Sequence, residues 1–93
     1  MISFELAIGF SAGFFTTIAF APQAFKTMMT QDTRGISLLM YLLFVTGVLL
    51  WIAYGVLQSD LAIIVANVLV FLLAFPILCI VWKNYFKNNK NIE

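Results

Sequence analysis

Two residues in this chain have the chemistry to bind a neutral, polar molecule, and they lie at matching depths. Trp51 is six residues before Leu57, the end of one apolar segment, and Asn67 is six residues after Leu61, the start of the next. At 1.5 Å per helical residue, each lies about 9 Å inside its segment. An indole ring covers apolar C–H patches, and an amide both donates and accepts hydrogen bonds. An asparagine that only joins two helices remains the competing interpretation.

The tryptophan belongs to a longer stripe that would share one face of a helix. The stripe follows a three-four spacing and comprises Met40, Phe44, Gly47, Trp51, Tyr54 and Gln58. Such a stripe is typical of lipid contact or of packing within a bundle. Tryptophan is usual at the membrane–water interface, and Trp51 would lie deeper than that. Its indole N–H therefore needs a hydrogen-bond partner or a water-filled cavity.

Equally informative are the residues that the chain lacks. It has no histidine, a single cysteine (Cys79) and no charged residue between Leu6 and Phe25, Leu38 and Leu57, or Leu61 and Trp82. No nucleophile–base pair or metal-ligand cluster can be assembled, so we expect neither an enzyme nor a cofactor. In membrane proteins, proton relays and ion sites use charged groups within the apolar segments, and the apolar segments of this chain have none. The sequence therefore favours a small, neutral solute that moves down its own gradient.

The three uncharged segments are predicted to cross a membrane. They contain 20, 20 and 22 residues, and the whole 93-residue chain is 63% hydrophobic and only 10% charged. About 20 apolar residues cross a bilayer core as a helix, the form that satisfies every backbone group. We predict one all-α membrane domain over residues 1–93, with spans near 6–25, 38–57 and 61–82 and a tail at 83–93.

The charged residues predict the orientation of these spans. All five Lys and Arg residues fall in the loop between the first two spans or in the tail, which three crossings place on one side. The positive-inside rule then predicts an external N-terminus and a cytoplasmic C-terminus. A net charge of +1 without a basic cluster argues against nucleic acid as a partner.

The first span has two further features. Small residues recur every four positions at Gly9, Gly13, Thr17 and Ala21, which allows a neighbouring helix to approach closely. Near its inner end, Pro22 removes a hydrogen bond to the carbonyl of Ile18 and should kink the helix. The kink could be a hinge or simply the helix end. In the third span, Pro76 frees the carbonyl of Leu72 in the same way.

Three helices enclose little room for a solute path. Parallel repeats related by an axis along the membrane normal are an established transporter architecture. We therefore expect a parallel homodimer, in which two copies of Trp51 and Asn67 face one cavity. With an aromatic face and amides to bond hydroxyls, such a cavity would suit a neutral sugar.

The residues from about Gly9 to Tyr85 resemble the SemiSWEETs, the bacterial half-size relatives of SWEET sugar transporters within the PQ-loop family. The resemblance lies in the three spans, the Pro22–Gln23 pair, Trp51 and Asn67. It implies a three-helix bundle in spatial order one-three-two, which dimerises in parallel into a six-helix transporter. It also implies a central sugar site, alternating access and a place in the bacterial cytoplasmic membrane.

The same resemblance implies roles for individual residues. Trp51 and Asn67 would contact the sugar, and Pro22 and Gln23 would form the hinge. Tyr54 and Asp60 would form the outer gate, although Gln58 stands where a basic residue would pair with Asp60. From their apolar bulk near the kink, we assign the inner gate to Phe20, Met40 and Phe44.

Two other functions compete with a sugar uniporter. A PQ-loop amino-acid transporter would be expected to carry acidic groups in its spans, which this chain lacks. A small membrane assembly subunit would need no polar pair at matched depth.

Overall fold

The computed structural model of the chain describes residues 3–92, with side chains from Ser3 to Lys87. Of the predicted tail, Lys90 and Glu93 therefore lie outside the described side chains. The described residues form three helices: α1 (Phe4–Thr30), α2 (Leu38–Gln58) and α3 (Leu61–Ile92). All three are long and apolar enough to cross a membrane, as predicted.

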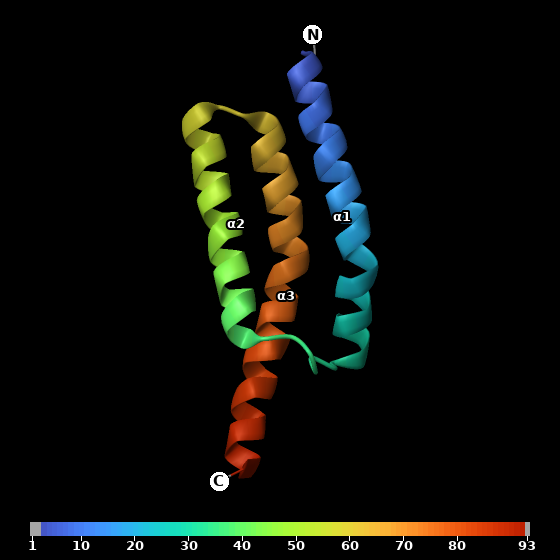
Figure 1. Cartoon of the computed structure of the whole chain (residues 1–93), viewed down its shortest axis with the longest axis vertical. Helices are drawn as coiled ribbons and strands as arrows, with labels where there is room; N and C mark the ends of the chain where they lie inside the picture. The colour runs from blue at the N-terminus through green and yellow to red at the C-terminus, as the bar shows by residue number, and fades with distance from the viewer. Residues whose placement is uncertain (1–2, 93) are drawn as a thin grey trace.

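Helix α3 lies between the other two (Figure 1). It packs against both α1 and α2, whereas no Cα atoms of α1 and α2 in the described chain approach within 8 Å. The spatial order one-three-two is thereby confirmed. The chain termini lie at opposite ends of the bundle, because three crossings are an odd number (Figure 1).

Short polar side chains define where the helices begin. The hydroxyl of Ser3 accepts a hydrogen bond from the backbone N–H of Leu6 at 3.0 Å, and that of Ser37 accepts from Met40 at 3.2 Å. Such caps satisfy donors that have no partner within the helix. At their other ends, α1 and α2 stop at Gln31 and Ser59, which adopt left-handed backbone conformations.

Two helices extend beyond the predicted spans. α1 continues from Phe25 to Thr30, and α3 continues past Trp82 to Ile92, so the predicted tail is helical through Ile92. The loss of apolar character shows where the hydrocarbon ends, not where a helix ends, and the Lys and Met residues of these extensions are good helix formers. Since α1 runs eight residues beyond Pro22, this proline is not a helix terminus. α1 changes direction in the half that contains Pro22 (Figure 1).

The row of small residues in α1 packs against α3 of the same chain. A Cβ atom added at Gly9 would lie 2.6 Å from the Cβ of Ala62, and one at Gly13 would lie 2.7 Å from that of Ala66. The predicted close approach is therefore present. The neighbouring helix at the two glycines is α3 of the same chain, so this face of α1 is not available to a second copy.

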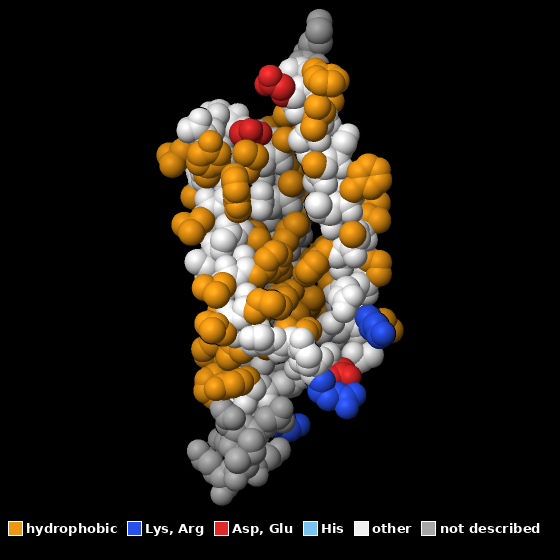
Figure 2. All heavy atoms as spheres, in the orientation of Figure 1, with side chains coloured by type: hydrophobic (Ala, Val, Ile, Leu, Met, Phe, Trp, Pro, Cys, Tyr) orange, Lys and Arg blue, Asp and Glu red, His pale blue; other side chains and the backbone are white. Residues whose placement is uncertain are grey.

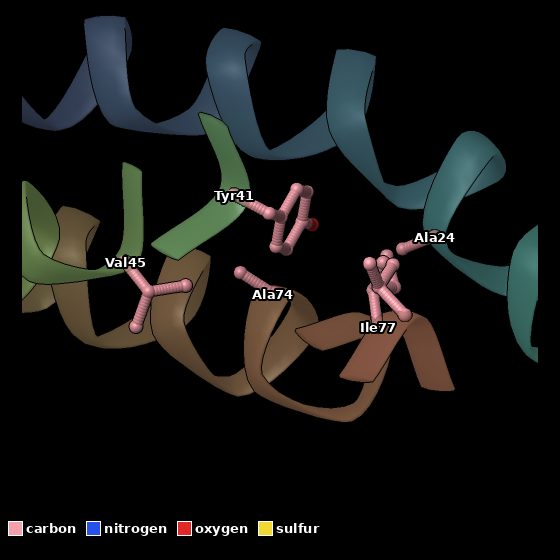
Figure 3. Packing of buried hydrophobic residues seen from close by; sticks show 6 residues of the cluster. Ala24, Tyr41, Val45, Ala74 and Ile77 are labelled. Atoms are coloured by element: carbon pink, nitrogen blue, oxygen red, sulfur yellow. The ribbon is translucent and has the colours of Figure 1, made fainter. Parts of the chain in front are cut away.

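The opposite half of the bundle is held by a buried apolar cluster (Figure 3). Its members come from all three helices and are Ala24, Tyr41, Val45, Ala74, Ile77 and Val81. Ala24 of α1 and Ala74 of α3 have no exposed surface. Ala24 points towards Ile77 of α3, and the ring of Tyr41 of α2 lies beside Ala74 (Figure 3).

A polar loop joins α1 to α2 and is attached to the extension of α3. The amide of Asn84 donates from Nδ2 to the carbonyl of Gln31 and to the hydroxyl of Thr33, both at 3.0 Å. Within the loop, Arg34 forms two hydrogen bonds to the carboxylate of Asp32, at 3.0 and 2.9 Å. The Arg34 guanidinium lowers the pKa of Asp32 to about 2.

Candidate solute-binding groove

A groove runs along α3 between α1 and α2, and it consists of two adjoining cavities. The first, of about 360 Å³, begins near Gly9 and Ala62. The second, of about 520 Å³, continues past Gly47 to Phe20 and Phe44. Sites for small molecules have volumes of roughly 300–1,000 Å³. Figure 2 shows apolar side chains along this hollow, and no charged side chain of the described chain lines either cavity.

Trp51 and Asn67 lie together in this groove. Both line both cavities, so the alignment expected from their equal depth is present. The two-residue connection Ser59–Asp60 sets this register, because it leaves little freedom to slide α2 along α3.

The indole ring of Trp51 is oriented by its neighbour on α2. Its ring centroid lies 5.6 Å from that of Tyr54, with the planes nearly perpendicular at 88°. This edge-to-face arrangement is a favourable geometry for aromatic pairs. Trp51 remains 54% exposed, which leaves ring surface free for further contacts.

The amide of Asn67 is partly committed to its own helix. Its Nδ2 donates to the carbonyl of Ile63 at 2.9 Å, one turn earlier. Its Oδ1 accepts no hydrogen bond from any described residue. Because an amide oxygen has two lone pairs, Asn67 can still accept hydrogen bonds in the groove.

At one end of the groove, aromatic rings from α1 and α2 meet. Phe20 and Phe44 stack with centroids 6.1 Å apart and planes inclined by 29°, and Tyr41 lies 5.7 Å from Phe44. The structure thus brings together two of the three residues assigned to an inner gate. The third, Met40, is 58% exposed and lines neither cavity.

At the other end, the two residues assigned to an outer gate, Tyr54 and Asp60, line different surface depressions. The carboxylate of Asp60 accepts from the backbone N–H of Ile63 at 3.2 Å and so caps α3. Asp60 lines a surface depression with Glu5 and Gln58, whereas Tyr54 lines a different one with Trp51. Within one protomer, the structure does not bring Tyr54 and Asp60 into a common pocket.

The remaining assigned pair, Pro22 and Gln23, lies on the exposed side of α1. Neither residue lines the two cavities.

Two residues that line both cavities were not anticipated from the sequence. Thr16 of α1 and Val70 of α3 line both cavities, together with Trp51 and Asn67. Thr16 follows Ala12 and precedes Phe20 at four-residue intervals, and these three residues lie on the groove side of α1. This spacing was the available signal, but we singled out the neighbouring row that contains Thr17.

Comparison with known proteins agrees with this architecture. Residues 5–64 match the family model of the PQ loop repeat. A protein of Escherichia coli (strain UMEA 3162-1), named sugar transporter SemiSWEET, is 50% identical over 84 residues, covering 90% of this chain and 94% of that protein. The chain belongs to the SemiSWEET family of PQ-loop proteins. A sugar transporter SemiSWEET of Leptospira biflexa is 53% identical over 64 residues, covering 69% and 75% of the two chains.

Solved SemiSWEET structures share the fold. A crystal structure of SemiSWEET in the inward-open conformation matches with a TM-score of 0.87 at 49% identity, covering 91% of each chain. A crystal structure of a bacterial homologue of SWEET transporters matches with a TM-score of 0.75 at 37% identity, covering 84% of this chain and 94% of the other. The chain is thus a multi-pass membrane protein of the bacterial SemiSWEET type, and the SemiSWEET relatives are named as transporters, not enzymes.

Proposed function

We propose that this protein is a sugar transporter, which moves mono- or disaccharides across the membrane as a homodimeric uniporter. The observation that carries the proposal is the uncharged groove in which Trp51 and Asn67 lie together. An indole face suits the C–H patches of a sugar ring, and an amide suits hydroxyls, which both donate and accept. The names of the relatives, sugar transporter SemiSWEET, support the same substrate class.

A second copy would complete the site. Within one protomer α1 and α2 are separated by α3, so the groove has a floor and two walls but no cover. A parallel copy facing the groove would supply the cover. It would also place a second Trp51 and a second Asn67 around one central space, large enough for a sugar.

Alternating access would require the groove to open at one end at a time. We propose that the ring pair Phe20–Phe44, with Met40, forms the inner gate, and that Tyr54 and Asp60 act at the outer end. Pro22, with Gln23 beside it, would be the hinge, because a proline inside a helix leaves one backbone carbonyl without its usual donor.

The distribution of charge supports an external N-terminus and a cytoplasmic C-terminus in the bacterial inner membrane. Figure 2 shows that the basic side chains gather at one end of the molecule, with one acidic side chain among them, whereas the other end carries acidic side chains alone on the face shown. The basic end comprises the last turns of α1, the α1–α2 loop and the extension of α3, as the positive-inside rule requires for a cytoplasmic face.

Uptake of radiolabelled sugar into liposomes that contain only this protein tests the function. The wild-type protein should equilibrate D-glucose or sucrose without accumulating it, and a protonophore should have no effect, because no ionisable group lies in the groove. Uptake against the gradient that collapses with a protonophore would disprove uniport. Cross-linking in membranes should trap parallel dimers, and exclusively monomeric or antiparallel products would disprove the proposed assembly.

Variants test the site itself. Trp51→Ala and Asn67→Ala should each abolish most uptake while the protein remains folded, and Trp51→Phe should keep part of it. Trp82→Ala is the matched control, since Trp82 is 49% exposed, similar to Trp51, but lines neither cavity. Full uptake by both groove variants would show that Trp51 and Asn67 serve packing alone.

A further inference from the structure

We propose that Thr16 is a third polar contact for the sugar, and that its hydroxyl oxygen accepts a hydrogen bond from one sugar hydroxyl. This inference rests on the proposed function and adds a residue to the same site. It would give each of the three helices one contact: Thr16 on α1, Trp51 on α2 and Asn67 on α3.

The position of Thr16 is the first argument. The two cavities meet where they share four lining residues, namely Thr16, Trp51, Asn67 and Val70. Among these four, the polar side chains other than the indole are the hydroxyl of Thr16 and the amide of Asn67. A solute held between Trp51 and Asn67 would therefore lie beside Thr16, on the opposite wall of the groove.

The hydrogen bonding of Thr16 is the second argument. Its Oγ1 donates to the carbonyl of Gly13 at 3.1 Å, which uses the one hydrogen of the hydroxyl. The lone pairs of the same oxygen accept nothing from the described residues. Asn67 is arranged in the same way, with a donor given to its own helix and an acceptor left over. Two acceptors on facing helices suit a ligand that has several O–H donors.

A purely structural role for Thr16 has to be separated from this one, because threonine hydroxyls often bond to the carbonyl one turn earlier. Thr17 provides the control. Its Oγ1 is buried without a partner, and Thr17 lines neither cavity. Thr16→Val and Thr17→Val make the same chemical change one residue apart, but on different sides of α1.

The experiment measures competition in proteoliposomes. The probe is whichever of D-glucose and sucrose the wild-type protein exchanges, and the competitors are its analogues that each lack one hydroxyl of the glucosyl ring. Thr16→Val should raise the half-saturating sugar concentration about 2- to 10-fold, the range for one neutral hydrogen bond. Thr16→Ser, which keeps the hydroxyl, and Thr17→Val should both stay near the wild-type value.

The competition profile identifies a direct contact. One deoxy analogue should compete more weakly than the parent sugar for the wild-type protein but equally well for Thr16→Val, while the other analogues keep their ranking. An unchanged profile in Thr16→Val, or the same change in Thr17→Val, would overturn the assignment of Thr16 and leave the proposed function standing. A wild-type protein that exchanges neither sugar would overturn both.

Discussion

Replacing Gly13 by alanine should push α1 away from α3, and the size of the effect can be worked out from the structure. The new Cβ would lie 2.7 Å from the Cβ of Ala66, whereas ordinary contact begins near 3.4 Å. Neither atom can rotate away, because each is fixed to a helix backbone. The helices must therefore separate locally by at least about 0.7 Å.

The free energy of unfolding should fall accordingly. Overpacking costs about 1–3 kcal/mol, and the better helix propensity of alanine returns about 0.5–1 kcal/mol. The net loss lies between zero and about 2.5 kcal/mol, and its middle value of about 1 kcal/mol corresponds to a melting temperature lower by about 4–8 °C in a chain of this length. The assay heats samples of the detergent-solubilised protein to a series of temperatures. The protein that remains folded is then measured by size-exclusion chromatography with tryptophan fluorescence detection.

Two further variants make this prediction refutable. Gly13→Ala combined with Ala66→Gly exchanges the two side chains, so that the new Cβ faces the Cα of residue 66 at 3.5 Å, and the melting temperature should return close to the wild-type value. Gly47→Ala is the control, because a Cβ at Gly47 would meet nothing within 4 Å, and it should be as stable as the wild type or slightly more so. If Gly13→Ala melts like the wild type, or the exchange restores nothing, the close contact does not limit the packing.

Three further outcomes are expected. Asn84→Ala removes both hydrogen bonds between α3 and the α1–α2 loop, so amide hydrogen exchange in the loop should become faster, and an unchanged rate would show that the loop is ordered without them. The carboxylate of Asp32 should titrate near pH 2 by NMR, so the stabilisation from its ion pair with Arg34 is present above about pH 4 and is lost as the pH falls through 2. Arg34→Gln should return the pKa of Asp32 towards 3.8, and a wild-type midpoint already near 3.8 would contradict the pairing. Pro22→Ala should slow sugar exchange with little change in the half-saturating concentration, and normal rates in a folded variant would argue against a hinge.

Much of the fold follows from the sequence, because a helix that crosses the hydrocarbon of a bilayer needs about 20 consecutive apolar residues. Apolar length identified all three helices, and the short connection Ser59–Asp60 aligned Trp51 with Asn67. Helix ends were less predictable. α1 continues through Lys26 to Thr30, since a lysine that is excluded from the hydrocarbon is still a good helix residue.

The place of α1 could not be derived in the same way. The loop of residues 31–37 joins it to α2 but leaves its rotation open, so the sequence did not indicate which side of α1 faces the groove. That rotation is fixed by Gly9 and Gly13 against the alanines of α3. We recognised the small residues but not their partner, and Thr16, on the adjacent side of α1, was therefore missed.

The termini at opposite ends of the bundle restrict how two copies could be joined in one polypeptide (Figure 1). A short polar linker from the end of α3 to the start of a second α1 would remain on one side of the membrane and would force the second copy to insert upside down. A tandem fusion with both copies parallel would need a linker that crosses the hydrocarbon, which requires about 20 apolar residues. Such a fusion would allow Asn67 to be replaced in one half only, and so would show whether transport needs both amides.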